Sequence, residues 1–241
     1  MSLTLSSWII FKNLLIFTAA FMLFTVIGTI SHEYGHIIPA QIAGYDTTLH
    51  FGSMSTDQSA LIKELDTIYA HHTYEIENDL PYEQQEKFDK LMQKLYSDSF
   101  WITIGGPLST ILTGCVGLLI LINRRKSIRK FGMKFMDWLA VFLSLFWLRE
   151  VFNLLHAVGY TVIYGGDNYF GGDEMYISEY YFLHPGVVPI ILALIGAGVG
   201  IFVICNIMPR KFRTEFILSG IIGGPVGFYL WFEILGPILI P

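Results

Sequence analysis

Five long apolar stretches dominate the sequence and restrict the folds that it can adopt. They cover roughly residues 8–30, 100–122, 135–164, 186–208 and 216–240. Each reaches the ~20 residues that a helix needs to cross ~30 Å of hydrocarbon. Only 15% of the chain is charged, whereas about a quarter of a typical soluble domain is charged. We therefore expect an all-α polytopic membrane protein with about five transmembrane helices.

The first apolar stretch is predicted to be a transmembrane helix and not a cleaved signal peptide. It carries one basic residue, Lys12, and no small-residue cleavage site follows it. Cys115 and Cys205 both lie inside apolar stretches. We expect them to pack in the membrane and to form neither a disulfide nor a metal-binding pair.

One long polar segment, residues 44–99, separates the first two spans. It holds eleven of the twenty acids, four lysines and no arginine. The helical spacing of its apolar residues predicts an acidic helical hairpin that breaks near Pro81. The glycines, threonines and alternating apolar residues of GYDTTLHFGSM, residues 44–54, predict a short strand or β-hairpin. We interpret the insert as an extramembrane cap within a single membrane-embedded domain, residues 1–241.

Basic residues gather in two short loops, NRRKSIRKFGMK at 123–134 and RKFR at 210–213. Short loops rich in Lys and Arg tend to remain in the cytoplasm. This bias predicts a cytoplasmic N-terminus, with the insert, the 165–185 loop and the C-terminus on the other side. The end of the first span, the start of the second and the loop after the third then meet at one membrane face.

The end of the first span carries HEYGH at residues 32–36. Because residues four apart share a helix face, His32 and His36 can bind one metal ion, and Glu33 can reach a water beside it. This HExxH pattern is typical of zinc hydrolases, in which the metal lowers the pKa of its water towards ~7 and the glutamate is the general base. We expect Gly35 to leave room for a substrate backbone.

The alternative is that these polar groups merely meet lipid headgroups at the helix end. Ionisable groups inside a span cost about 2.5–3.5 kcal/mol or more at its centre, and by default they mark a functional site. A solitary headgroup contact would also not require the His–Glu–x–Gly–His order. We therefore favour one catalytic zinc ion.

A catalytic zinc ion needs a third protein ligand and one open position. Asp173 in GGDE and Asp167 in GGDN each follow a glycine pair that permits tight backbone geometry. We rank Asp173 first, with Asp167 and His156 as alternatives. The competing interpretation makes these acids part of a polar turn or a helix cap.

The third span carries a polar stripe of Arg149, Asn153 and His156, with Glu150 beside it. Such groups inside a span need partners or water. One interpretation has Arg149 or Asn153 orient a ligand carboxylate or stabilise a developing oxyanion. The other, which we favour, is an interhelical polar clamp.

The order of these motifs resembles that of the site-2 protease family of intramembrane zinc metalloproteases. The similar elements are HEYGH (32–36), GGPLST (105–110) and GGDE (171–174), and they lie in the first three spans and the loop that follows. The resemblance implies two His and one Asp on zinc, Glu33 as base and hydrolysis of a peptide bond in or near the membrane. It also implies that a strand at TTLHFGSM holds an extended substrate. Thr110 stands where the second motif of the family often has Asn.

We therefore expect a zinc endopeptidase that acts in the lipid bilayer on a membrane-anchored protein, with no nucleic-acid partner. Gly105, Gly106, Pro107 and Asn153 are added as candidate substrate-binding residues. The main alternative is a non-catalytic binding or regulatory protein that retains the fold, and Glu33 argues against it. A transporter is disfavoured because the sequence has no internal repeat. Familiar members of the family place the site towards the cytosol, whereas the charge bias here predicts the opposite face.

Overall fold

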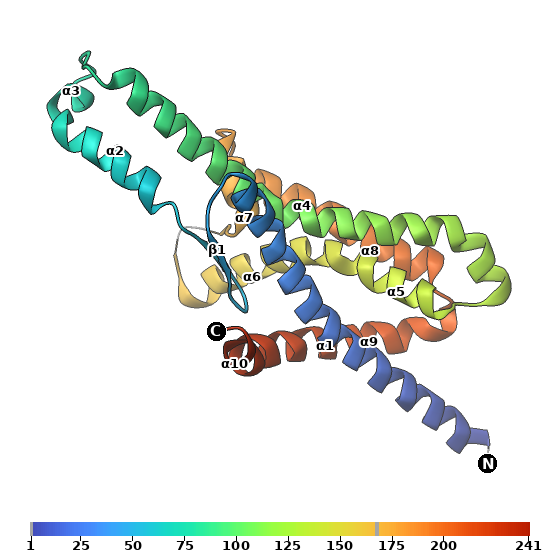
Figure 1. Cartoon of the computed structure of the whole chain (residues 1–241). Helices are drawn as coiled ribbons and strands as arrows, with labels where there is room; N and C mark the ends of the chain where they lie inside the picture. The colour runs from blue at the N-terminus through green and yellow to red at the C-terminus, as the bar shows by residue number, and fades with distance from the viewer. Residues whose placement is uncertain (1, 167–168) are drawn as a thin grey trace.

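The computed structural model describes residues 2–166 and 169–241, and most of them are helical (Figure 1). Within these residues, five helical units are long and apolar enough to cross a membrane. They are Ile10–Ile42, Gln85–Phe131, Phe135–Tyr164, Val187–Ile207 and Arg210–Leu239. The prediction of an all-α polytopic membrane protein with five spans is confirmed.

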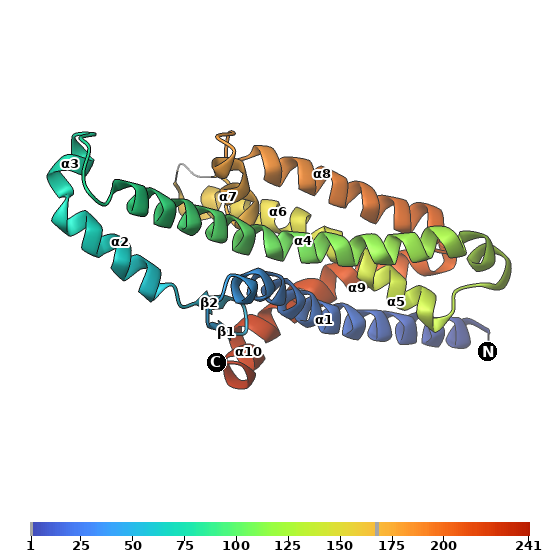
Figure 2. The same ribbon diagram turned by 45° about the horizontal axis from the view of Figure 1, so that its top comes forward.

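Two long helices form the frame of the bundle, α1 (Ser2–Ile42) and α4 (Gln85–Phe131). At a rise of 1.5 Å per residue, the 47 residues of α4 extend about 70 Å, more than twice the ~30 Å of hydrocarbon. The start of α4 therefore projects beyond the spans, beside α2 (Figure 2). Helix α1 continues without interruption through HEYGH, so the motif lies inside a helix and not at its end.

The insert has the elements that its sequence predicts. Strands β1 (Thr47–Leu49) and β2 (Met54–Thr56) form an antiparallel hairpin. Helices α2 (Ser59–His71) and α3 (Thr73–Glu77) follow and lead back to the start of α4. Helix α2 buries its apolar face, Leu61, Leu65 and Ile68, and packs on α4.

The third span is interrupted. It consists of α5 (Phe135–Ser144), the 3₁₀ turn η1 (Leu145–Trp147) and α6 (Leu148–Tyr164). After the loop that follows comes the short helix α7 (Asp173–Tyr180). It lies against α4 and α8.

The last two spans each contain a π-helical turn. The fourth is α8 (Val187–Phe202) with η2 (Val203–Ile207). The fifth is α9 (Arg210–Tyr229), η3 (Leu230–Leu235) and α10 (Gly236–Leu239). The indole N–H of Trp231 in η3 donates to the carbonyl of Phe51 at 2.7 Å, which ties the fifth span to the turn of the β-hairpin.

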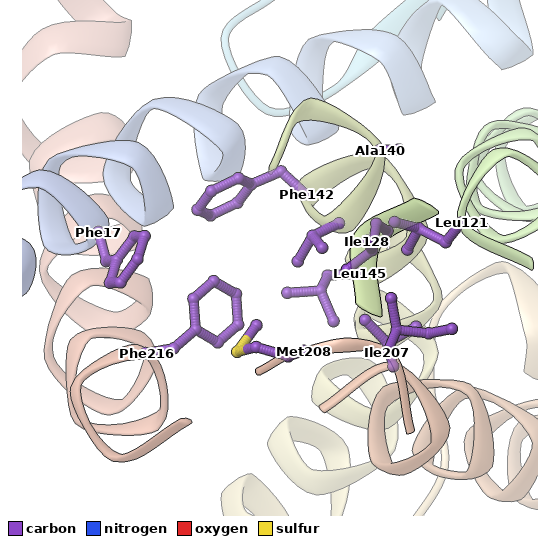
Figure 3. Close-up of a cluster of buried hydrophobic side chains, with 11 residues drawn as sticks. Phe17, Leu121, Ile128, Ala140, Phe142, Leu145, Ile207, Met208 and Phe216 are labelled. Atoms are coloured by element: carbon purple, nitrogen blue, oxygen red, sulfur yellow. The ribbon is translucent and has the colours of Figure 1, made fainter. Parts of the chain in front are cut away.

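The main apolar core lies where the N-terminal half of α1, the end of α4, α5, η2 and α9 converge (Figure 3). Its buried members are Phe17, Leu121, Ile128, Ala140, Val141, Phe142, Leu145, Val203, Ile207, Met208 and Phe216. Beside it, the Arg124 guanidinium pairs with the buried carboxylate of Asp137. The N-terminus lies at this basic end of the bundle, while the β-hairpin and the C-terminus lie at the other (Figure 1).

Helices α1 and α9 pack closely because α9 presents glycines to α1. A Cβ atom at Gly223 would lie 2.7 Å from the carbonyl oxygen of Thr18 and 2.8 Å from the Cβ atom of Phe21. A Cβ atom at the next residue, Gly224, would meet nothing within 4 Å. Small residues are the common means by which membrane helices approach each other.

Gly223→Ala is expected to lower the free energy of unfolding by about 1–3 kcal/mol, because the added methyl group overpacks the α1–α9 contact. Gly224→Ala is the matched control. It should leave stability unchanged or raise it by up to about 1 kcal/mol, since Ala favours a helix over Gly. An SDS titration of both variants in micelles measures the difference. Equal losses would contradict this account of the packing.

Candidate metal centre

The site begins with a close approach of α1 and α4. A Cβ atom at Gly105 would overlap the carbonyl oxygen of Gly35, and one at Gly106 would overlap the Nε2 atom of His36. The two helices therefore touch through backbone at Gly35 and Gly105. The imidazoles of α1 occupy the space that a side chain at Gly106 would fill.

This contact changes the interpretation of Gly35. We expected it to leave room for a substrate backbone, but it faces Gly105 and the side chain of Ser109. That expectation is wrong: Gly35 serves the packing of α1 on α4. The Ser109 hydroxyl donates to the carbonyl of Ser31 at 2.9 Å and adds a polar link at the same contact.

Three of the predicted ligands meet at this point. The Asp173 Oδ2 atom lies 2.9 Å from His32 Nε2 and 3.2 Å from His36 Nε2. One ligand atom of each residue lies within 4.8 Å of those of the other two. Both imidazoles are buried. Two imidazoles and one carboxylate form the three-ligand set of many mononuclear catalytic zinc sites.

The outer nitrogens of the two imidazoles have partners that fix their orientation. His36 Nδ1 lies 2.7 Å from the carbonyl oxygen of Ile102, which can only accept, so Nδ1 carries the proton. His32 Nδ1 lies 3.0 Å from Thr110 Oγ1. Because the Thr110 hydroxyl donates to the carbonyl of Gly106 at 3.1 Å, its oxygen is free to accept from His32.

This arrangement favours a cation between the three residues. With Nδ1 protonated, the Nε2 atom of each neutral imidazole presents a lone pair, and both lone pairs face a carboxylate oxygen. Three electron-rich atoms at this distance repel one another unless a proton or a metal ion lies between them. A protonated Nδ1 bound to an outer acceptor is also the usual arrangement of metal-binding histidines. The residues therefore fit a zinc ion.

Asp173 is the first residue of α7, and the backbone before it requires glycine. Gly172 has φ +78°, a conformation that L-residues rarely adopt. Burial raises the pKa of the Asp173 carboxyl, but when a proton on His32 or His36 Nε2 donates to it, this contact outweighs burial and holds the pKa of the carboxyl below the ordinary value. The carboxylate is therefore ionised at neutral pH and able to bind a cation.

Glu33 follows His32 on the same helix and is buried. Its carboxyl group lies within electrostatic range of His36, Arg149 and Asp173. Arg149 of α6 lies within electrostatic range of His32 as well. Within the described residues, the buried Nε atom of Arg149 has no hydrogen-bond partner.

Further residues that we predicted for the site are Asp167, His156 and Asn153. Asp167 lies outside the described residues. His156 is exposed, with its ring 5.8 Å from that of Phe152, and it is not in the metal-binding group. The Asn153 amide donates to Glu174 at 3.0 Å. This bond clamps α6 to α7, which is the interpretation that we favoured for the polar stripe.

The second motif packs against α1. Gly106 and Pro107 are buried, and Gly105 lies against Gly35. Binding of substrate by these three residues and Asn153 stays a prediction. Thr110 and Ile102 are additions that we did not predict as site residues. Thr110 could have been found from the sequence, because it lies one helical turn after Gly106 and therefore shares its helix face.

No model of a known protein family matches the chain, and no curated protein or solved structure matches it. The function must therefore be argued from the site.

Thr110→Val is expected to weaken zinc binding by about 10–100-fold, because it removes the oxygen that accepts from His32 while keeping the side-chain volume. Thr110→Ser keeps the hydroxyl and should bind zinc within a few-fold of wild type. Competition with a chromophoric chelator measures both affinities. Equal affinities in the two variants would contradict the proposed role of the hydroxyl.

Proposed function

We propose that this protein is an intramembrane zinc endopeptidase that hydrolyses a peptide bond of a membrane-anchored protein. One observation carries the proposal: His32, His36 and Asp173 converge within 4.8 Å, with Glu33 beside them, inside a bundle of apolar helices. The resemblance of HEYGH, GGPLST and GGDE to the motifs of the site-2 protease family supports it.

A zinc ion held by these three residues would act as a Lewis acid, polarising the scissile carbonyl and lowering the pKa of a bound water. The chain supplies the remaining chemistry. Glu33, the residue after His32, is the group that would accept the proton of the attacking water and pass it to the leaving amine. Ile102 and Thr110 hold the imidazoles in place, so the ligands need no rearrangement during the reaction.

The substrate is proposed to bind as an extended segment. Helices are poor protease substrates because their carbonyls are hydrogen-bonded within the helix, so a transmembrane substrate must unwind near the site. The hairpin of β1 and β2 packs against α1, the helix that carries HEYGH. An edge of this hairpin offers backbone groups to which an extended peptide can pair, as the family resemblance implies.

The orientation of the site in the membrane is also a proposal. The basic segments 123–134 and 210–213 lie at the end of the bundle away from the β-hairpin (Figure 2). By the distribution of Lys and Arg, that end is cytoplasmic, and the site lies nearer the opposite face.

Metal analysis and hydrolysis test the activity together. Purified wild type is expected to contain about one zinc ion per chain and to cleave members of a panel of quenched-fluorescent single-span peptides in liposomes. Glu33→Gln should keep the zinc and lose hydrolysis by about 10²–10⁴-fold, the usual contribution of a general base. Asp173→Ala should lose both.

Two outcomes would contradict the proposal. Wild-type protein that contains no zinc would contradict the proposed metal site. Zinc-loaded wild type that cleaves no peptide, or cleaves no faster than Glu33→Gln, would favour the non-catalytic alternative. An exposed carboxyl in the insert, Glu83, provides the control: Glu83→Gln should leave zinc content and hydrolysis unchanged.

Single-cysteine variants test the orientation. In a chain with Cys115 and Cys205 replaced by Ala, Ser59→Cys in the insert should react with a membrane-impermeant maleimide on intact cells. Ser127→Cys in the basic segment should react only after the cells are opened. The reverse pattern would put the site towards the cytosol.

A further inference from the structure

The ligand Asp173 has a neighbour that no step of the proposed reaction uses. Glu174 is the second residue of α7 and is 1% exposed. Consecutive residues of a helix diverge by about 100°, so Glu174 faces away from Asp173. Its Oε1 atom accepts from the Asn153 amide at 3.0 Å, and Glu150 of α6 lies beside its carboxyl group. A buried carboxyl group is costly and is retained where its contacts have a role.

Helix α7 is held differently at its two ends. At its C-terminal end, the Tyr180 ring stacks on Phe100 of α4 at 4.1 Å. In its middle, the Ser178 hydroxyl accepts from the backbone N–H of Val188 in α8 at 3.1 Å. These contacts fix the part of α7 that is farthest from Asp173.

The N-terminal turn of α7, which carries Asp173, has weaker support from the backbone. It follows two glycines, Gly171 and Gly172, the second with φ +78°. The backbones of α6 and α7 make few close approaches. Among the contacts of the described residues, the hydrogen bond of Asn153 with Glu174 links α6 to this turn, and Glu150 lies beside it. A Cβ atom at Gly172 would also lie 2.9 Å from the other carboxylate oxygen of Glu174, so this side chain packs over the turn.

We propose that Asn153 and Glu174 are positioning residues for the metal site: their hydrogen bond holds the first turn of α7 on α6 and so directs Asp173 at His32 and His36. Neither residue is a ligand. The inference rests on the proposed function only in its requirement for a metal ion at the three ligands. Glu174, which we did not predict as a site residue, then has a role in the site, and Asn153 has a reason to lie in a span.

The test is the metal affinity of the full-length protein in micelles, measured with zinc and with cobalt. Asn153→Ala and Glu174→Ala are expected to weaken zinc binding by about 10–100-fold, the range known for groups that orient metal ligands. The visible spectrum of bound cobalt should change, because Asp173 no longer reaches the ion in the same geometry. Glu174→Gln keeps an oxygen that accepts from Asn153 and should restore both the affinity and the spectrum.

Glu179→Ala is the matched control, because Glu179 is an exposed carboxyl on the same helix. It should bind both metals as wild type does. If Asn153→Ala fails to fold, the metal affinities and cobalt spectra of Glu174→Ala and Glu174→Gln are sufficient to test the proposal.

Wild-type affinity and cobalt spectrum in Glu174→Ala would overturn the proposal while leaving the metal site intact. Equal losses in Glu174→Gln and Glu174→Ala would also overturn it, because the hydrogen bond would then not be the cause. A wild-type protein that binds neither metal would instead overturn the proposed function itself.

Discussion

The backbone contact of α1 with α4 at Gly35 and Gly105 is the constraint on which the site depends. Any side chain at Gly105 or Gly106 would push α4 away from α1. The imidazoles of His32 and His36 would then lose Thr110 and Ile102, the partners on α4 that orient them. The GGP motif thus positions the candidate ligands through packing, and binding of substrate by this motif stays a prediction.

The apolar core and the candidate site lie at opposite ends of the bundle. The basic end has a dense apolar core around Phe216 and Phe142, where α1, α5, α9 and the end of α8 meet. The other end carries the polar site, the β-hairpin and the acidic insert. Such a division suits the proposed function, because polar groups inside hydrocarbon are tolerated only where protein or water surrounds them. The densest apolar packing therefore lies away from the candidate site.

Much of this structure could be predicted from the sequence, since the strongest signals are local. Apolar length defines the five spans, and the i, i+4 spacing of His32 and His36 defines a common face. Asp173 and Asp167 could both be proposed because each follows a glycine pair beyond the third span, and the family resemblance favoured the element with Asp173. The structure brings Asp173 to the histidines, although a metal ion at these ligands stays a prediction.

The features that the sequence did not predict are contacts between residues far apart in the chain. Gly35 meets Gly105, Thr110 meets His32, and Glu174 meets Asn153. No periodicity within one segment encodes such pairs, because each depends on how two helices are placed relative to each other. The prediction for Gly35 was wrong for this reason. The sequence shows that a glycine leaves space beside the helix, but it does not show which group fills that space.

The central claim is that two imidazoles and one carboxylate hold a single zinc ion in this bundle. X-ray absorption at the zinc edge of the purified protein tests it most directly. We expect a shell of about four nitrogen and oxygen neighbours at ~2.0–2.2 Å, with the multiple scattering of two imidazoles and no sulfur. A sulfur neighbour near ~2.3 Å, or a shell without imidazole scattering, would contradict it.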